Sequence, residues 1–388
     1  MQNPVYLDYQ ATTPVDPRVF ETMRPYFMDQ FGNAGSVTHD YGDAAARAVE
    51  IAREQIATHI NAHPSEIIFV SGATEANNLG IQGLSSYLQK IGKVHILTSQ
   101  IEHKAVLDVL AKLEERGFDV TYLKPNSAGL FDLKIIEASM RPTTGLLCFM
   151  HVNNEIGVIN PILEIGRLAR ERDALFFCDA AQSFGKLSID VREMNIDLLS
   201  ISAHKIYGPK GIGALYRRKK LPLEPLIYGG GQEQGLRSGT LPVPLIVGFG
   251  EALKVASNGM ISEQQKILTL RDRLLQKLNE RIPDLLVNGD IQNRLAGNLN
   301  VSIPGIDADA LMNNFRSDIA VSNGSACTSL APQPSYVLKS LGANNERARG
   351  SIRIGIGRFT TEEQIDFAID VIVQNVSKLR NILSLHKV

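Results

Sequence analysis

The 388-residue sequence contains only three cysteines, and no two of them form a CxxC pair. This scarcity gives neither a disulfide framework nor a cysteine-ligated zinc site. The sequence also has no excess of charge of either sign, because it contains 40 basic and 41 acidic residues and its formal net charge is −1. No general electrostatic field is therefore available to attract nucleic acid or an anionic membrane, and a small-molecule substrate is expected.

Long hydrophobic runs are absent as well. Nowhere do about 18 apolar residues follow one another, as a transmembrane helix requires. The first residues, MQNPVYLDYQATTP, lack the positively charged segment and apolar run of a secretory signal. We therefore expect a cytoplasmic protein without a membrane partner.

The three cysteines occupy two kinds of sequence context. Cys148 in LLCFM and Cys178 in FFCDA lie among large apolar residues, where a free thiol behaves as a small hydrophobic side chain. Cys327 lies instead in SNGSACTSLAPQPS, whose small, polar and proline residues indicate a loop. A thiol in a loop is accessible, so Cys327 is the candidate for reactivity, although its context alone leaves an inert thiol equally open.

Short apolar runs alternate with longer amphipathic or small-residue stretches over residues 67–216. This alternation predicts an α/β fold with a mostly parallel sheet covered by helices on both faces. The later sequence has a long polar helical stretch, then three strand-like runs interleaved with helices, which predicts a smaller α+β domain. We expect a large domain over 16–250, a small domain over 251–388 that carries the Cys327 loop, and an N-terminal segment, 1–15, packed on the small domain.

Polar residues follow several of the predicted strands, at the edge of the sheet where ligands of open α/β folds bind. After IIFV comes SGATEANN, where backbone amides near Ala73 and Thr74 can hold a phosphate at a helix start. His103 follows VHILTS, Asn154 follows LLCFM within HVNNEIG, and Asp179 ends LFFCD. Each of these signals is weak when taken alone.

Lys205 in SAHKIYGPKG is the most informative residue of this edge. A buried lysine is costly unless it is paired or neutral, and a neutral amine is the nucleophile that forms an imine with a carbonyl. Pyridoxal enzymes also need an acid facing the pyridine nitrogen, and Asp179 ends the preceding strand. By itself Lys205 fits a surface loop, but together with Asp179, His103 and the phosphate-ready turn it predicts pyridoxal phosphate.

These motifs make the sequence similar to the class V aminotransferase group of fold-type I pyridoxal-phosphate enzymes, and within it to the NifS/IscS-like cysteine desulfurases. The similarity extends over nearly the whole chain. The segments that carry it are YLDYQATTPVDPRV, SGATEANNLGI, EHKAVL, HVNNEIGVI, DAAQSFGKLSID, SAHKIYGPKGIGALY, GGGQEQGLRSGTLPVP, VSNGSACTS, PSYVLKSLG and SIRIGIGRFTTEEQID.

The resemblance implies a set of cofactor-binding residues around pyridoxal 5′-phosphate. Lys205 would bind the cofactor as a Schiff base, and Asp179 would pair with its pyridine nitrogen. Gln182 would hydrogen-bond the ring hydroxyl, and His103 would stack on the ring. The other cofactor-binding residues that the resemblance implies are Ala73, Thr74, Asn154, Ser202, His204 and, from a second subunit of a homodimer, Thr240.

The resemblance also implies a reaction, in which L-cysteine becomes L-alanine and its sulfur stays on Cys327 as a persulfide. Asn154 and Arg353 would orient the substrate, Arg353 through a paired contact with its carboxylate. Lys205 and His103 would move protons as general base and acid. It implies no metal in the resting enzyme, and leaves open a transient iron–sulfur contact at Cys327 during transfer.

Several alternatives stay open at this point. The sulfur acceptor is a partner protein in iron–sulfur cluster assembly, tRNA thiolation or DNA phosphorothioation, and the sequence does not choose among them. A selenocysteine lyase or a class V aminotransferase would share the cofactor but not the need for Cys327. A catalytically idle docking protein would share only the fold. The basic run at 217–220 is weighed as a nucleic-acid contact, but a solvated turn explains it better in a near-neutral chain.

Overall fold

The computed structural model describes residues 4–323 and 334–385. Its largest sheet has seven strands in the order β2, β8, β7, β6, β5, β3, β4. Both pairings of β8, with β2 and with β7, are antiparallel, and the other four pairings are parallel. The predicted α/β fold with a mostly parallel sheet is confirmed. The strands are β2 (Ile67–Val70), β3 (His95–Ser99), β4 (Asp119–Leu123), β5 (Thr144–Cys148), β6 (Leu175–Asp179), β7 (Leu198–Ser202) and β8 (Gly213–Arg217).

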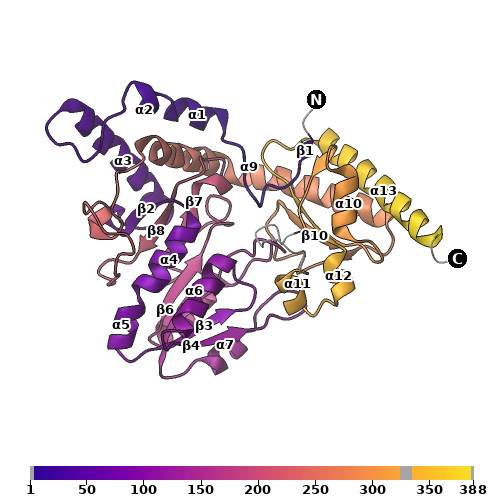
Figure 1. Cartoon of the computed structure of the whole chain (residues 1–388), viewed down its shortest axis with the longest axis horizontal. Coiled ribbons are helices and arrows are strands. Elements are labelled where there is room, and N and C mark those ends of the chain that lie inside the picture. The colour runs from indigo at the N-terminus through magenta and orange to yellow at the C-terminus, as the bar shows by residue number, and fades with distance from the viewer. Residues whose placement is uncertain (1–3, 324–333, 386–388) are drawn as a thin grey trace.

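Helices cover both faces of this sheet (Figure 1). Strand side chains alternate between two cores, so that Phe176 packs with helices α3, α8 and α9 while its neighbour Phe177 packs with α4, α5 and α6. Buried strands of this kind explain the continuous apolar runs of the sequence. The helices around the sheet are α1 (Pro17–Met23), α2 (Pro25–Met28), α3 (Asp40–His59), α4 (Ala73–Gly83), α5 (Ser85–Lys90), α6 (Lys104–Glu114), α7 (Leu133–Ser139), α8 (Ile162–Glu171) and α9 (Val243–Arg281).

A second unit follows in the C-terminal part of the chain and has its own apolar core. Its antiparallel sheet has the order β12, β10, β9. The N-terminal strand β1 pairs in parallel with β11 beside it, so the start of the described chain belongs to this unit. The elements of this small-sheet unit are β1 (Val5–Tyr6), β9 (Leu286–Val287), β10 (Asn298–Ser302), α10 (Ala308–Phe315), β11 (Ile319–Ala320), α11 (Tyr336–Ser340), α12 (Asn345–Arg349), β12 (Ser351–Gly355) and α13 (Glu362–Leu385).

The helix α9 belongs to both units. Ile246 and Phe249, near its start, lie in the core under the large sheet, whereas Leu274 and Leu278 lie in the core of the small-sheet unit. Figure 1 shows α9 passing from the side of α3 to the side of α13. The domain boundary predicted at residue 250 therefore falls inside a continuous helix, and the exact domain limits stay a prediction.

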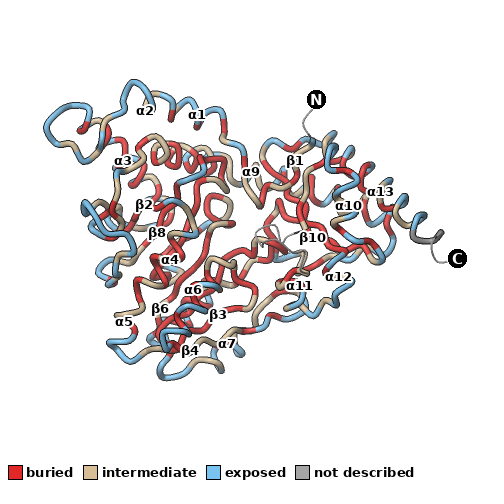
Figure 2. The backbone as a smooth tube through the Cα atoms, viewed as in Figure 1, coloured by how far each residue is buried: buried red, intermediate tan, exposed pale blue. Residues whose placement is uncertain are grey.

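Burial separates the two cores from an exposed rim (Figure 2). The central strands and the inner faces of the helices are buried, and Cys148 and Cys178 are both inaccessible, as their apolar context predicts. Cys327 lies outside the described residues. In the part of the chain that is described, every helix is too short or too polar to cross a lipid bilayer.

Candidate active site

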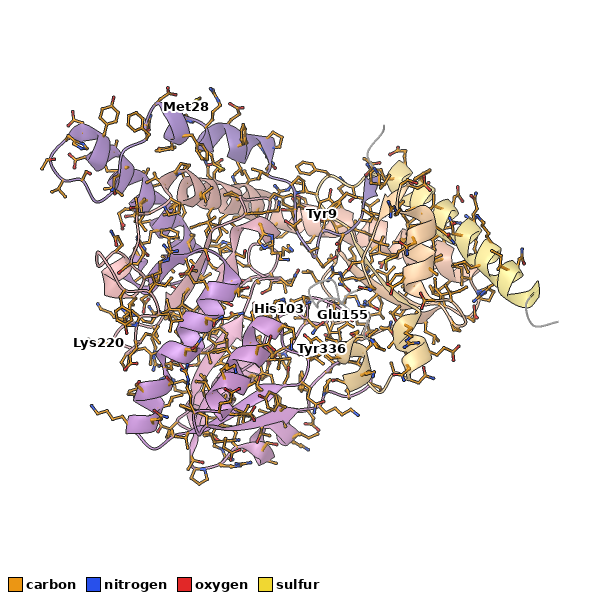
Figure 3. The ribbon with its side chains drawn as sticks, viewed as in Figure 1. Tyr9, Met28, His103, Glu155, Lys220 and Tyr336 are labelled. Atoms are coloured by element: carbon orange, nitrogen blue, oxygen red, sulfur yellow. The ribbon has the colours of Figure 1, made fainter. Side chains whose placement is uncertain are left out.

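A cavity of about 490 Å³ opens at the carboxyl ends of the parallel strands, next to the small-sheet unit. This volume suits a cofactor together with a small substrate. In Figure 3 the labelled side chains of His103, Glu155 and Tyr336 lie together at this place, between the two units. The cavity brings together ten of the twelve residues predicted from the sequence: Ala73, Thr74, His103, Asn154, Asp179, Gln182, Ser202, His204, Lys205 and Arg353.

Two predicted residues are not part of this cavity. Thr240 is exposed on the surface of the chain and does not line it. The resemblance assigns Thr240 to the site of a second subunit, and that assignment stays a prediction. Cys327 falls within the undescribed segment 324–333, so its predicted role also stays a prediction.

Lys205 ends a short 3₁₀ helix, Ala203–Lys205, that directly follows β7. Its Nζ donates hydrogen bonds to the backbone oxygens of Gln10 and Ala11, each over 2.6 Å. The backbone of Gln10 and Ala11, almost 200 positions earlier in the sequence, therefore fixes the position of the Lys205 amine in the cavity. The sequence reasoning missed Gln10 and Ala11, although they belong to the YLDYQATTP motif, because backbone carbonyls leave no signature in residue types.

Asp179 ends β6 and is buried at the floor of the cavity. Its Oδ2 accepts a hydrogen bond from the side-chain amide of Asn77 over 2.9 Å, and its Oδ1 accepts one from the backbone N–H of Ala181 over 2.9 Å. Both bonds fix the orientation of the carboxylate. Asp179 is therefore the acidic group of the cavity that would pair with the ring nitrogen of a bound cofactor.

The opposite end of the cavity is built to receive an anion. Gly72 precedes α4 and leaves the first backbone N–H groups of that helix, near Ala73 and Thr74, pointing outward. Ser202 at the end of β7 presents a hydroxyl to the same cavity. Nδ1 of His204 lies 3.0 Å from the hydroxyl of Thr12, and burial together with the Lys205 charge lowers the pKa of His204 to about 4. His204 is therefore a neutral hydrogen-bonding group at neutral pH.

His103 caps the start of α6, and its Nδ1 accepts the backbone N–H of Ala105 over 3.1 Å. Because Nδ1 acts as the acceptor, the ring proton resides on Nε2. The imidazole therefore has a fixed tautomer in the wall of the cavity.

The residues of the cavity fit pyridoxal phosphate, on the evidence of their unused hydrogen-bonding groups. Buried polar atoms normally have partners, so an unpartnered set in one cavity marks a place for a ligand. Among the described residues, seven buried atoms of the side chains that line this cavity have no hydrogen-bond partner: Gln10 Oε1, Asn77 Oδ1, Asn154 Oδ1, Glu155 Oε1, Gln182 Oε1, Ser202 Oγ and Arg353 Nε. Together with the helix start at Ala73 and the anion at Asp179, they match a ring that carries a phosphate and a polar substrate.

Arg353 on β12 comes from the small-sheet unit and has a fixed orientation. Its Nη2 pairs with Oδ1 of Asp8 over 2.7 Å, and its Nη1 donates to the backbone oxygen of Asn154 over 2.9 Å. The side chain is only 4% exposed, so its charge requires such partners. Arg353 lines the cavity and its Nε has no hydrogen-bond partner, which leaves one donor of the guanidinium available to a ligand. Asp8 was also missed, because its partner lies at the other end of the chain.

Two buried acids near the cavity were not predicted as site residues. Burial raises the pKa of Glu155, which lines the cavity, to about 7, and raises that of Glu102, behind His103, to about 8. Tyr336 of α11 donates its hydroxyl proton to the backbone oxygen of Glu102 over 2.7 Å and thereby links the two units beside the cavity. Glu155 follows Asn154 directly in HVNNEIG, so the motif was visible but offered no reason to choose the acid.

Comparison with known proteins supports the same assignment. A family model described as Aminotransferase class-V matches residues 5–367. The chain belongs to the class V aminotransferase family. The protein named Cysteine desulfurase IscS from Shewanella oneidensis is 54% identical over 384 residues, which are 98% of this chain and 94% of that protein. The protein of the same name from Vibrio vulnificus is 53% identical over 385 residues, with 98% and 95% coverage.

Solved structures agree with the sequence relatives. A structure titled NifS-like protein superposes with a TM-score of 0.90 at 36% identity and covers 96% of this chain and 99% of its own. A structure titled SspA in complex with cysteine has a TM-score of 0.78 at 42% identity, with 92% and 100% coverage. The predicted family is confirmed, and its cofactor is pyridoxal phosphate. The predicted enzyme class, a pyridoxal-phosphate-dependent cysteine desulfurase, is that of the IscS relatives.

Proposed function

We propose that this protein is a cysteine desulfurase that converts L-cysteine to L-alanine and keeps the sulfur on Cys327 as a persulfide. The observation that carries the proposal is the single cavity in which Lys205, Asp179 and Arg353 meet unpartnered polar groups suited to a cofactor and an amino acid. The IscS relatives and the cysteine-bound SspA neighbour support the choice of reaction and substrate.

The residues of the cavity divide the work of this reaction. Pyridoxal phosphate, when bound, withdraws electrons from the α-carbon of an amino acid, and Asp179 holds the charge at the ring nitrogen on which this depends. Arg353 orients the substrate carboxylate through its Nε edge. The Lys205 amine is the group that takes and returns the proton at the α-carbon, and the Nε2–H of His103 is a hydrogen-bond donor beside it.

The sulfur step balances within the substrate and one thiolate. The Cys327 thiolate attacks the substrate sulfur, so that an S–S bond forms and the C–S bond breaks. The electron pair of the C–S bond stays on the substrate carbon, which takes up a proton and becomes the methyl group of L-alanine. The persulfide on Cys327 then passes its outer sulfur to an acceptor protein. Iron–sulfur assembly, tRNA thiolation and DNA phosphorothioation stay the candidate routes.

A homodimer is part of the proposal, and an exposed apolar surface supports it. Large apolar side chains are exposed on α1, on α2, on the loop to α3 and at the start of α3, and Figure 3 labels Met28 among them. Patches of this kind on a folded chain are typical of protein interfaces. The exposed residues of this surface are Phe20, Phe27, Met28, Phe31, Val37 and Tyr41. The family resemblance assigns exposed Thr240 to the site of such a second copy.

The decisive experiment measures L-alanine and persulfide from L-cysteine without added thiol. We expect Cys327→Ala to lose turnover and to form no persulfide on the chain, as measured by mass spectrometry. The matched control, Cys148→Ala, removes one of the buried thiols and should keep both. Lys205→Ala should yield protein without the cofactor absorption band. Sulfur release at the parental rate from Cys327→Ala would favour the selenocysteine lyase or aminotransferase alternatives, and a colourless wild type would favour a docking protein.

A further inference from the structure

The turn that follows Lys205 has an unusual backbone conformation. Tyr207, two residues after the lysine, has φ = 66°, in the left-handed region that bulky side chains rarely adopt. Such a conformation persists only where the surrounding structure holds it in place, and it is often found at functional sites. The groups that hold Tyr207 therefore also decide where Lys205 points.

The N-terminal segment provides the first set of these groups. The backbone N–H of Tyr207 donates to Oγ1 of Thr13 over 2.9 Å, and its carbonyl accepts the N–H of Asp16 over 2.9 Å. Thr13 also binds the carbonyl of His204, through its hydroxyl over 3.0 Å and its N–H over 3.1 Å. This segment is the one whose backbone oxygens bind the Lys205 amine.

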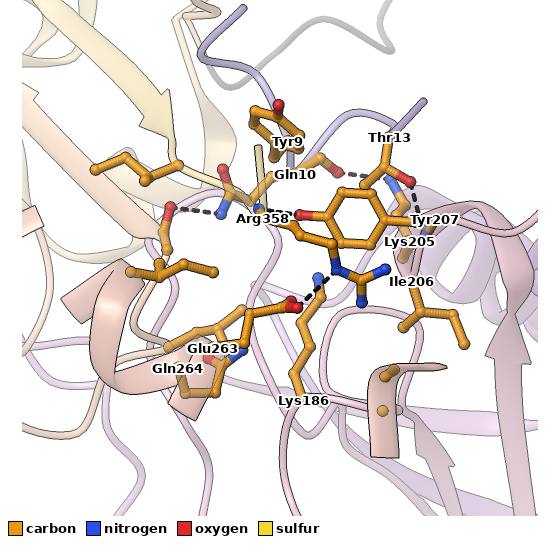
Figure 4. Close-up of a pocket in the computed structure, with 16 residues that line it drawn as sticks. Tyr9, Gln10, Thr13, Lys186, Lys205, Ile206, Tyr207, Glu263, Gln264 and Arg358 are labelled. Carbon is orange, nitrogen blue, oxygen red and sulfur yellow. Dashed lines mark hydrogen bonds and ion pairs between the residues drawn. The ribbon is translucent and has the colours of Figure 1, made fainter. Parts of the chain in front are cut away.

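Arg358 provides the second set, from the small-sheet unit (Figure 4). Its guanidinium lies 4.1 Å from the centre of the Tyr207 ring, and its backbone N–H donates to the Tyr207 hydroxyl. The same guanidinium pairs with Asp16 over 2.8 Å and with Glu263 of α9 over 2.6 Å. The Arg358 side chain is only 9% exposed, so its charge needs these two carboxylates, whereas Asp16 also pairs with the guanidinium of Arg18 over 2.7 Å.

Three parts of the chain thus meet on one strained tyrosine. Arg358 follows β12, the strand that carries Arg353, so a single short segment connects the predicted substrate contact to the Lys205 turn. An ion pair between Arg358 and Asp16 that served stability alone would not need to contact Tyr207. The backbone N–H of Asp16 nevertheless donates to the carbonyl of Tyr207, two residues after Lys205. We propose that Arg358 is a positioning residue for Lys205, which acts by holding Tyr207 and Asp16 in the conformation that presents the amine to the cavity.

The inference rests on the proposed function only in taking Lys205 as the cofactor-binding residue, and its test does not require turnover. The variants are Arg358→Gln, which removes the charge, and Arg358→Lys, which keeps it. The control is Arg273→Gln, because Arg273 also bridges two carboxylates, Asp366 and Glu362, but lies on α9 away from Lys205. The first readout is the pH midpoint at which the cofactor absorption band of the resting holoenzyme changes.

The second readout is measured on the cofactor-free protein. It is the rate at which acetic anhydride acetylates Lys205, divided by the rate for the exposed Lys112. We expect Arg358→Gln to move the absorption midpoint by at least half a pH unit and to change the relative acetylation rate at least threefold. Arg358→Lys should restore about half of each effect, and Arg273→Gln should match the wild type. The kcat for L-cysteine should fall at least tenfold in Arg358→Gln with KM within twofold, because Arg358 does not face the substrate.

A lower melting temperature with an unchanged midpoint and acetylation rate would overturn the proposal and leave a structural ion pair. If Arg358→Gln fails to fold, Tyr207→Phe decides, since it keeps the ring under the guanidinium but removes the hydroxyl that accepts the Arg358 N–H. The same shift, at smaller size, is expected there, and wild-type values would overturn the proposal. A wild type that binds cofactor but does not desulfurate cysteine would refute the proposed function and leave these readouts valid.

Discussion

The side-chain amide of Asn77 donates a hydrogen bond to Oδ2 of Asp179 across 2.9 Å, from the interior of α4 to the end of β6. Asn77 is fully buried, and it lies under the cavity rather than at its mouth. Its bond fixes the orientation of the carboxylate that is proposed to pair with the ring nitrogen of the cofactor. Asn77 has no assigned role in the reaction, but we expect it to affect cofactor binding through Asp179.

Replacement of Asn77 by Ala should weaken cofactor binding. A hydrogen bond to a charged acceptor contributes about 1.5–3 kcal/mol, which corresponds to roughly a ten- to hundredfold increase in Kd for pyridoxal phosphate. Fluorescence titration of the cofactor-free protein measures this directly. Asn375→Ala on α13, where the amide binds only its own helix, serves as the control. Equal affinities for Asn77→Ala and wild type would show that Ala181 alone orients Asp179.

Glu102 should make stability depend on pH. Burial raises its pKa from 4.5 to about 8, so the folded protein keeps a proton that the unfolded chain releases. Between these values the folded state binds more protons, and its contribution to the free energy of unfolding falls as the pH rises. Glu102→Gln cannot titrate and should gain stability relative to wild type from about pH 5 to about pH 8.

Urea unfolding at several pH values tests this linkage. The exposed acid Glu115 gives the control variant, Glu115→Gln, whose difference from wild type should not follow the same trend. A difference between Glu102→Gln and wild type that stays constant with pH would mean that Glu102 is ionised in the folded protein.

Arg353→Lys should damage recognition of the substrate carboxylate. A lysine has one ammonium and cannot contact Asp8, the Asn154 carbonyl and a carboxylate in the planar arrangement of a guanidinium. We expect KM for L-cysteine to rise at least about tenfold, or roughly 1.4 kcal/mol. The substrate analogue 3-mercaptopropionate, which has the carboxylate, should lose affinity to a similar degree.

Cysteamine, which lacks the carboxylate, should bind Arg353→Lys as it binds wild type. The control Arg281→Lys alters an exposed pair with Asp370 and should change none of these constants. Equal losses for cysteamine and 3-mercaptopropionate would indicate a general distortion of the cavity instead.

Thr240 should act in the site of the partner subunit. Mixed dimers of Lys205→Ala chains with Thr240→Val chains contain one site that has both native residues, provided that the two come from different subunits. We expect such mixtures to recover sites of wild-type cofactor affinity, whereas Thr240→Val alone binds cofactor more weakly. If mixing recovers no tight sites, Thr240 acts within its own chain or not at all.

The sequence predicted most of the large sheet, because buried parallel strands such as IIFV and LLSIS are nearly continuous apolar runs. The domain boundary that it predicted at residue 250 falls inside the continuous helix α9. The glycines at 248 and 250 interrupt the apolar pattern, but a Cβ at either position would come too close to Met23 or Gln55, so these glycines allow α9 to pack closely against α1 and α3. Two-residue strands such as β1 have too little sequence to be predicted at all.

In the candidate site too, some residues could be predicted from the sequence and others could not. Residues that follow apolar runs, such as Asp179 and Lys205, were found because a polar residue at a strand end is visible in the sequence. Asp8 and Asn77 were not found, because their roles come from partners far away in the chain or from the interior of a helix. No local pattern encodes such a contact, and only the folded chain brings it about.

The pairing of β1 with β11 has a consequence for the protein as it is made. Val5 and Tyr6 leave the ribosome early, but Ile319 and Ala320 follow only after roughly 15–60 s of synthesis at typical elongation rates. Until then β1 has no strand to pair with. The segment 10–16, which hydrogen-bonds to the turn at Lys205, is therefore not yet held in place by the pairing of β1 with β11. Arg358 arrives later still. The large sheet can fold while translation continues, but its lysine receives its final surroundings only when the chain is almost complete.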